Sequence, residues 1–504
     1  YKLNTLHLHL TDDEGWRLEI QELPELTEIG AFRGHTKDEK DHLFPAYGSG
    51  PEPDPDNTYG SGYLSRDDFK EILRYANDRH VEVIPEFNFP GHARAAIKSM
   101  EIRYERLLAE GKTEEAERFR LIDPEDNSVY NSAQNYKDNI VCVCRESVFN
   151  FYTTVIDDVI EMYKEADVPL KSFHTGGDEV PMGSWLKSPM CAEFLESRPE
   201  LGEAKHLQAY FLDRVRIILG ERDLNTAGWE EIVMKKLDNG GWEPIVKFAE
   251  NRDVIPYVWN NLSGWEDLGN RLLNAGFPVV LCDVGNFYFD LAYYKEGEEY
   301  GHNWGGFVST RDAFQFVPYD VYMSTKRDNM GNEFDYDTHF AGMERLKPES
   351  RENILGLQGQ LWSETIKGGE MLEYYYLPKM LGLAERAWVG QPDWASIKNK
   401  STRKSAEDES WNVFANRLGQ RELLRLDKIF GGYKYRIPLP GAIKKDGKLH
   451  ASIQYPGLII RYTIDGSAPD MNSHVYEGPI DATGTIKLKA FNTVGRGSRT
   501  SIVE

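Results

Sequence analysis

The stretch FHTGGDEVP, residues Phe173 to Pro181, places two carboxylates, Asp178 and Glu179, directly behind a short apolar run and a double glycine. The run Lys171–Gly177 has the length and composition of a buried β-strand. In β/α barrels the active site is built where parallel strands end, so polar residues gather at that edge. The same arrangement repeats along the chain and decides the fold class.

Six further runs have this character, and amphipathic segments alternate with them. The runs are Leu3–Leu10, Val81–Phe87, Asn225–Glu231, Ile255–Asn261, Pro278–Asn286 and Ile354–Trp362. Among the amphipathic segments, Ser65–His80 begins with a capping box at Ser65 and Asp68, and Phe149–Ala166 shows helical periodicity. Repeated strand–helix units predict an α/β fold, a TIM-type (β/α)8 barrel. Such a barrel has eight strands, so we expect its first strand and helix to be absent from this chain.

The length also predicts a second domain, because a single core rarely grows past ~250–300 residues and this chain has 504. We assign residues 1–425 to the barrel, 426–440 to a Gly/Pro-containing linker, and 441–504 to a small all-β domain, an immunoglobulin-like sandwich. The pair Asp465-Gly466 predicts a hairpin within it. Two insertions, residues 34–62 and 99–139, are long enough to shape a site or cover a surface.

Composition excludes several classes of partner. The formal net charge of -23 argues against nucleic acid and anionic membrane surfaces, which both bind basic patches. The sequence contains no apolar run of the ~18 residues that span a bilayer. Its four cysteines make no disulfide scaffold and no zinc-type spacing. We expect neither a metal nor a cofactor.

The adjacent carboxylates admit two interpretations. Asp178 and Glu179 could cap the next helix or bind Ca²⁺, but the double glycine favours a site that something approaches closely. Glycosidases that use two carboxylates place them on opposite sides of one sugar ring, which neighbouring residues cannot do. We therefore expect one to protonate the leaving oxygen. The other would hold a substrate 2-acetamido group whose carbonyl oxygen attacks the anomeric carbon.

The chain resembles the family 20 glycoside hydrolases, the β-N-acetylhexosaminidases, and among them the bacterial chitobiase type. The resemblance runs in order from Tyr1 to about Trp388, and the C-terminal residues are similar to the small terminal domain of chitobiases. The matching stretches are YKLNTLHLHLTDDEGWRLEI, ELPELTEIGAFRG, LFPAYGSGP, VIPEFNFPGHARAA, FHTGGDEVP, TAGWEEI, LQGQLWSET and LAERAW.

The resemblance implies a role for each matching residue. Glu179 matches the general acid/base, and Asp178 matches the residue that orients the acetamido group. The implied sugar contacts are made by Asp12, Trp229, Trp259, Tyr288, Asp290, Trp304, Trp362 and Glu364. Trp229, Trp259 and Trp362 would wall the acetamido pocket, Tyr288 would bond the acetamido oxygen, and Trp304 would stack on a second sugar. Core packing is the alternative for any single tryptophan.

Two features depart from the family pattern. His92 matches a histidine that supports the acid, and the family pairs it with an aspartate four residues earlier, where this chain has Asn88. We expect the Asn88 amide to orient the imidazole without stabilising its charged form. The arginine that grips the non-reducing sugar belongs to the first barrel strand and is not found here.

The resulting prediction is an exo-acting, retaining glycoside hydrolase. It would remove terminal non-reducing β-N-acetylglucosamine from chitobiose and chitin oligosaccharides, with N-acetylgalactosamine as a second candidate sugar. A barrel chitinase would show a DxxDxDxE-like strand, which the sequence lacks. A non-catalytic sugar-binding homologue is the alternative from another class. The resemblance implies a periplasmic or secreted protein.

Overall fold

The computed structural model describes residues 1–45, 49–56, 58–237, 241–481 and 483–504. Residues 46–48, within the predicted stretch Leu43–Pro51, lie outside them. The described chain forms two compact units, each treated by itself below. Unit 1 is Tyr1–Val284 with Gly342–Gln358, and unit 2 is Gly285–Ala341 with Gly359–Glu504. The predicted boundaries at 425 and 441 stay a prediction.

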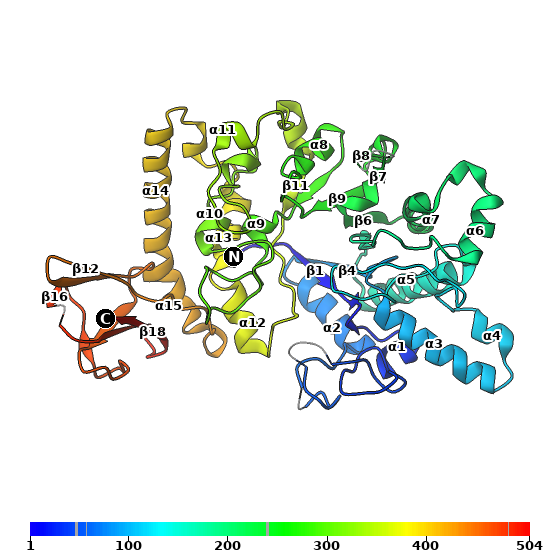
Figure 1. Cartoon of the computed structure of the whole chain (residues 1–504), viewed down its shortest axis with the longest axis horizontal. Coiled ribbons are helices and arrows are strands. Elements are labelled where there is room, and N and C mark those ends of the chain that lie inside the picture. Colours follow the sequence, from blue (N-terminus) through cyan, green and yellow to red (C-terminus); the bar gives the residue numbers. More distant parts are fainter. Residues whose placement is uncertain (46–48, 57, 238–240, 482) are drawn as a thin grey trace. The chain divides into compact units, whose positions relative to one another are not determined.

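Unit 1 contains a parallel sheet of seven strands, ordered along the sheet as along the chain (Figure 1). All seven predicted strands are confirmed, although each is shorter than the apolar run that predicted it. They are β1 (Thr5–His9), β4 (Glu82–Glu86), β5 (Ser172–His174), β6 (Asn225–Trp229), β9 (Val254–Val258), β10 (Val279–Leu281) and β11 (Ile354–Leu357).

The two edge strands differ from the inner ones in burial. β1 and β11 carry no fully buried residue, and Leu6 and Leu355 are 40% and 53% exposed. In contrast, every residue of β5 is buried. Within the described residues β1 pairs only with β4, and β11 only with β10. Apolar side chains are therefore exposed along both open edges of the sheet.

Helices pack against this sheet as the alternating pattern predicts. The capping box of α2 (Arg66–Asn77) is present at Ser65 and Asp68. Helix α5 (Glu146–Ala166) buries one face. The hydroxyl of its Tyr163 donates to the carbonyl of Val83 in β4 at 2.8 Å, and the hydroxyl of its Tyr152 donates to the carbonyl of Phe87, just after β4, at 2.9 Å. The remaining α-helices of unit 1 are α1 (Glu25–Glu28), α3 (Arg94–Ala109), α4 (Thr113–Glu117), α6 (Pro189–Glu196), α7 (Leu207–Gly220) and α8 (Leu268–Asn274).

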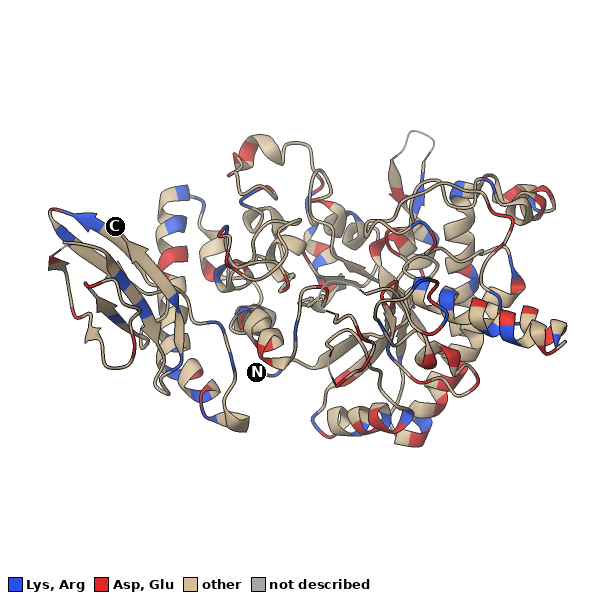
Figure 2. Cartoon of the chain, turned by 60° about the horizontal axis from the view of Figure 1, so that its bottom comes forward, with Lys and Arg blue, Asp and Glu red and all other residues tan. Residues whose placement is uncertain are grey.

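Two short antiparallel hairpins complete unit 1. One joins β2 (Thr11–Asp12) and β3 (Gly15–Trp16), and the other joins β7 (Met234–Lys236) and β8 (Trp242–Pro244). In Figure 2, acidic and basic residues alternate along the helices. Among the described residues, no helix is both long enough and apolar enough to cross a membrane.

Unit 2 combines helices with two small antiparallel sheets. Its α-helices are α9 (Val284–Phe287), whose first residue belongs to unit 1, α10 (Thr310–Phe314), α11 (Tyr336–His339), α12 (Gly369–Tyr376), α13 (Lys379–Val389), α14 (Lys400–Arg417) and α15 (Leu423–Leu426). One sheet holds β12 (Gly441–Lys445), β13 (Lys448–Ser452) and β16 (Ile480–Asp481). The other holds β14 (Ile459–Thr463), β15 (His474–Val475), β17 (Ile486–Phe491) and β18 (Gly497–Val503). Leu449, Ile460, Ile486 and Leu488 form the core between these sheets.

The predicted hairpin at Asp465-Gly466 is confirmed, since the consecutive strands that flank it are paired antiparallel, although its loop is longer than two residues. That pair lies in the longer connection between β14 and β15, where Asp465 accepts from the backbone N–H of Ser467 at 3.0 Å. The tight hairpin is formed by Asp446-Gly447 between β12 and β13, with both residues at positive φ (51° and 74°). A two-residue turn of this kind needs such backbone angles at both positions.

A buried ion-pair cluster stabilises unit 2. Glu299 is inaccessible and accepts from Arg436 at 2.7 Å and 3.1 Å, from Arg499 at 2.8 Å, and from the Tyr374 hydroxyl at 2.7 Å. These partners come from segments far apart in the sequence. The cluster therefore ties the strand β18 and the segment before β12 to the helical part of unit 2.

We expect Arg436→Met to destabilise the protein by roughly 3–5 kcal/mol, because a buried carboxylate loses its bidentate partner. Urea unfolding followed by tryptophan fluorescence measures this. Lys448→Met is the matched control, since Lys448 and Asp481 form an exposed pair at 3.9 Å of a kind worth under ~1 kcal/mol. Equal effects of the two substitutions would contradict the assignment.

Candidate active site

The double glycine brings the backbone that follows β5 into close contact with the segment that follows β4. Gly176 and Gly177 have φ of +67° and +93°, and a Cβ on Gly176 would lie 1.9 Å from the side-chain oxygen of Asn88. Only glycine fits such a close approach at positive φ. The turn delivers Asp178 and Glu179 past the carboxyl end of the strand. Glu179 itself has φ +51°, a conformation that costs a non-glycine residue about 1–3 kcal/mol and recurs at functional sites.

Asn88 takes a different role from the one predicted. It was expected to orient His92, but its amide donates to Asp178 at 2.8 Å and its carbonyl oxygen accepts from the N–H of Gly177 at 3.0 Å. Because Asn88 is buried, both bonds are sheltered from water. Asn88 therefore fixes the orientation of Asp178, and the expectation that it partners His92 is corrected.

His92 is held instead by Asp12. Its Nδ1 lies 3.0 Å from Oδ1 of Asp12, and its Nε2 lies 3.4 Å from Oε2 of Glu179 and 3.8 Å from Oδ2 of Asp178. Burial lowers the pKa of the imidazole, but the carboxylates of Asp12 and Asp178 outweigh it and raise the pKa well above its usual value. Asp12, His92 and Glu179 thus form a carboxylate–imidazole–carboxylate line.

Neighbouring segments complete the surroundings of the two carboxylates. Gln134, from the second predicted insertion, donates to Glu179 at 3.2 Å, and the N–H of Glu179 donates to Glu231 at 3.3 Å. Burial raises the pKa of Asp178 to about 6, and the charge of Glu179 adds to the shift, although His92 opposes it. The insertion therefore shapes the site, as its length predicted.

The predicted tryptophans of unit 1 differ in burial. Trp229 is 1% exposed and donates from Nε1 to Glu86 at 2.9 Å. Trp259 is partly exposed at the end of β9, where its backbone N–H donates to the buried Glu230 at 3.1 Å. Burial raises the pKa of Glu230 to about 8. Trp229 is the last residue of β6 and Trp259 directly follows β9, so both lie at the carboxyl ends of their strands, as Asp178 does. Their contact with sugar stays a prediction.

The other predicted sugar-binding residues belong to unit 2. The ring of Tyr288 lies 5.8 Å from that of Trp304 and 6.3 Å from that of Trp362. Asp290 is buried, and burial together with the charge of Glu364 raises its pKa to about 7. The predicted residues thus fall into two groups, one around Asp178 in unit 1 and one around Tyr288 in unit 2.

A buried lysine holds the second group in place. Lys379 donates to the backbone carbonyls of Phe289 and Leu291 at 2.9 and 2.6 Å, on either side of Asp290. Burial lowers its pKa to about 7. Lys379 therefore fixes the segment that carries Tyr288 and Asp290, a role that no local sequence pattern indicated.

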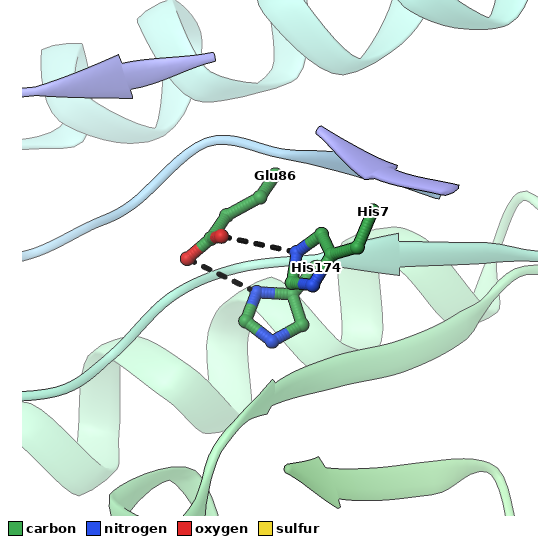
Figure 3. A group of neighbouring side chains, drawn as sticks. All are labelled: His7, Glu86 and His174. Atoms are coloured by element: carbon green, nitrogen blue, oxygen red, sulfur yellow. Dashed lines mark ion pairs between the residues drawn. The ribbon is translucent and has the colours of Figure 1, made fainter. Parts of the chain in front are cut away.

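Three groups of unit 1 contain side-chain atoms of the kind that bind metals. They are His7 with Glu86 and His174, Asp12 with Asp13 and His92, and His92 with Asp178 and Glu179. Figure 3 shows the first, in which Glu86 pairs with His7 at 3.0 Å and with His174 at 3.2 Å. In each group the carboxylate oxygens lie within ion-pair distance of a histidine nitrogen. We interpret all three groups as a charge network.

Sequence reasoning missed several residues of this network. Glu86, His9 and His174 lie at the carboxyl ends of their strands, which is the position that identified Asp178. Glu231 lies two residues after Trp229, in the predicted strand run Asn225–Glu231. The signal was present, but the pairing of residues some 80 positions apart cannot be read from a local pattern.

Comparison with known proteins agrees with these motifs. Residues 1–391 match the catalytic domain of glycosyl hydrolase family 20, and residues 422–500 match the chitobiase/beta-hexosaminidase C-terminal domain. A beta-hexosaminidase of Vibrio vulnificus is 37% identical over 92% of this chain and 55% of its own length. The N,N'-diacetylchitobiase of Vibrio harveyi is 36% identical over 96% of this chain and 58% of its own length. The chain spans about half the length of the curated relatives it matches.

A solved structure shares the fold. The crystal structure of the family 20 exo beta-N-acetylglucosaminidase from Vibrio harveyi, in complex with N-acetylglucosamine, aligns with a TM-score of 0.61 at 28% identity. The alignment covers 86% of this chain and 54% of that one.

Proposed function

Because the chain belongs to glycosyl hydrolase family 20, with that family's TIM-like barrel fold and a C-terminal all-β domain, we propose that it is an exo-acting β-N-acetylhexosaminidase. Its substrates would be chitobiose and chitin oligosaccharides, from which it removes terminal N-acetylglucosamine. The observation that carries this proposal is the adjacent pair Asp178 and Glu179, backed by His92 and Asp12.

The proposed reaction proceeds in two steps. Glu179 donates a proton to the leaving oxygen while the acetamido carbonyl oxygen of the substrate attacks the anomeric carbon. Asp178, oriented by Asn88, accepts from the acetamido N–H and stabilises the positive charge of the cyclic oxazolinium intermediate. Water then opens that ring as Glu179 takes back a proton. Two displacements at one carbon retain the anomeric configuration.

The aromatic group of unit 2 suits the same substrate. Tyr288, Trp304 and Trp362 offer ring faces and a hydroxyl, and Asp290 and Glu364 offer carboxylates for sugar hydroxyls. A sugar has apolar faces and a polar edge, so both types of side chain are needed. We propose that these residues bind the non-reducing sugar and the next one.

Hydrolysis of chromogenic β-glycosides tests this function. We expect release of the chromophore from the N-acetylglucosaminide, slower release from the N-acetylgalactosaminide, and none from the glucoside, which lacks the acetamido nucleophile. Binding of N-acetylglucosamine without hydrolysis would favour the non-catalytic alternative. Hydrolysis of the glucoside at a similar rate would contradict the mechanism.

We also propose that one further parallel strand, lying between β11 and β1, closes the barrel and carries an arginine for the non-reducing sugar. The exposed leucines on the two edge strands, Leu6 and Leu355, support this, because closed barrels leave no strand edge. Hydrogen exchange tests it. The edge amides of β1 and β11 should gain protection in a longer protein with its native upstream segment, and unchanged exchange would contradict the idea.

Two finer features complete the proposal. The two sheets formed by strands β12 to β18 are consistent with an immunoglobulin-like sandwich, which a solved structure of the domain would test.

Export to the periplasm or to the medium rests on the family resemblance alone. Cell fractionation of the source organism, followed by an activity assay, tests the location.

A further inference from the structure

The line of charged groups behind Glu179 does not end at Asp12. Oδ2 of Asp12 lies 2.9 Å from Nε2 of His9, and Nδ1 of His9 lies 2.8 Å from Oε2 of Glu86. Glu86 is inaccessible and His9 partly buried. The groups thus alternate as Glu86, His9, Asp12, His92 and Glu179, which we call the buried relay.

His9 is chemically distinct from the other histidines around Glu86. Each of its two ring nitrogens faces a carboxylate oxygen at hydrogen-bond distance. A neutral imidazole has only one N–H and would present a lone pair to one of these carboxylates. The contact with Asp12 is a hydrogen bond and the contact with Glu86 is an ion pair, and both are favourable only when His9 is the doubly protonated cation. Electrostatics agree: although burial lowers the pKa of His9, Glu86 and Asp12 raise it to about 10.

The remaining partners of Glu86 are neutral donors. Nδ1 of His7 accepts from the amide of Gln358 at 3.1 Å, which leaves its proton on Nε2, facing Glu86. Burial lowers the pKa of His174 to about 4, and Trp229 donates through its indole N–H. The charge of Glu86 is therefore balanced by His9. Burial raises the pKa of Glu86, but the charge of His9 outweighs it and holds that pKa well below the usual value.

We propose that His9 and Glu86 are positioning residues for acid catalysis. His9 fixes Asp12, which fixes His92, and the positive charge of His9 sets the pH at which the His92–Glu179 pair loses its proton. The inference rests on the proposed function, because it assigns Glu179 as the acid. Glu86 in turn keeps His9 protonated inside the barrel.

The direction of the effect follows from charge. A cation near the His92–Glu179 pair favours loss of the proton that the pair shares, so it makes Glu179 a better acid. Among the described residues, the other titratable groups that contact the pair are carboxyl groups. They are Asp13, whose Oδ2 lies 3.6 Å from His92, Asp178, and Glu231, whose pKa burial raises well above its usual value. Replacing His9 by a neutral residue therefore leaves a more negative site that holds its proton more tightly.

The test compares His9→Gln with His7→Gln. Both replace a histidine of strand β1 that contacts Glu86, but only the first removes a charge. We expect His9→Gln to move the alkaline limb of the kcat profile to higher pH by about 0.5–1 unit, the order of a Coulomb interaction between partly buried groups. We expect His7→Gln to leave that limb in place. Equal shifts for both, or none for His9→Gln, would overturn the proposal.

Leaving-group dependence gives a second readout. His9→Gln should leave an acid that is both weaker and less well positioned, so kcat for chitobiose should fall ~10-fold, a fraction of the full value of a general acid. It should lower kcat for a dinitrophenyl glycoside less than ~2-fold, because that leaving group departs without a proton. Loss of stability alone would slow both substrates equally, and that result would count against the relay.

The charge of His9 can also be read without any activity. In the unaltered protein, nitrogen NMR of ¹⁵N-labelled histidine should show His9 with both ring nitrogens protonated at pH 8, beside His92, whose pKa is also raised. The His9 signal should be missing from His9→Gln. If that variant does not fold, Glu86→Gln serves instead, because loss of its carboxylate should lower the titration midpoint of the same signal. A neutral His9 at pH 8 would overturn the inference, whereas absence of hydrolysis by the unaltered protein would reject only the proposed function.

Discussion

Replacing Glu179 by Gln lowers the turnover of chitobiose by ~10²–10⁴, the value of a well-placed general acid. The amide keeps the shape of the side chain and its contact with Gln134, but it has no proton to give. His92 cannot replace it, because His92 is buried and its Nε2 faces Glu179 and Asp178. The loss should therefore appear in the first chemical step.

Substrates with different leaving groups test this assignment. Pre-steady-state measurement of bond cleavage should show a small loss for a dinitrophenyl glycoside and the full loss for chitobiose. Gln134→Ala is a matched control, since it removes the neighbour but keeps the acid. If Glu179→Gln slows all leaving groups to the same extent, Glu179 is not the acid.

Asp178→Asn impairs the acetamido-dependent step and removes the acidic limb of the pH profile. In the unaltered protein Asp178 must be ionised to stabilise the oxazolinium, and burial raises its pKa to about 6. Activity should therefore rise as pH increases through about 6. The variant should lose ~10²-fold or more in kcat, the scale of one electrostatic contact to a transition state, and its residual activity should be flat across this range.

A cyclic thiazoline inhibitor separates this loss from general damage. The inhibitor mimics the oxazoline, so the unaltered protein should bind it far more tightly than substrate. Asp178→Asn should bind it weakly, while Asn88→Ala should show a partial loss because Asn88 orients Asp178. Tight binding of the inhibitor by Asp178→Asn would refute the role of this carboxylate.

Strand order could be predicted from the sequence because each strand of a parallel barrel is a local apolar run followed by a helix. Each predicted run extends one to five residues beyond the C-terminal end of the observed strand. Residues such as Trp259 continue the apolar run although they lie beyond the last residue of the strand, Val258. The β12–β13 hairpin was missed because Lys444, Lys445 and Lys448 interrupt its apolar pattern.

The electrostatic architecture of the site could be predicted only in part. The turn with Asp178 and Glu179 follows from its two glycines, and His92 from its motif. Which carboxylate holds His92 depends on how β2 and the turn after β4 meet in space. The family resemblance indicated position 88 and not Asp12. The buried relay through His9 and Glu86 likewise depends on inward-facing side chains of neighbouring strands.

The most direct test of the central claim is the rate of hydrolysis of glycosides whose acetamido group carries none, two or three fluorine atoms. Fluorine withdraws electrons from the carbonyl oxygen, so a mechanism in which that oxygen attacks the anomeric carbon slows steeply along the series. We predict such a fall in kcat/KM, together with retention of anomeric configuration. A rate that does not depend on fluorination, accompanied by a sugar–carboxylate ester detected on the protein by mass spectrometry, would contradict the account.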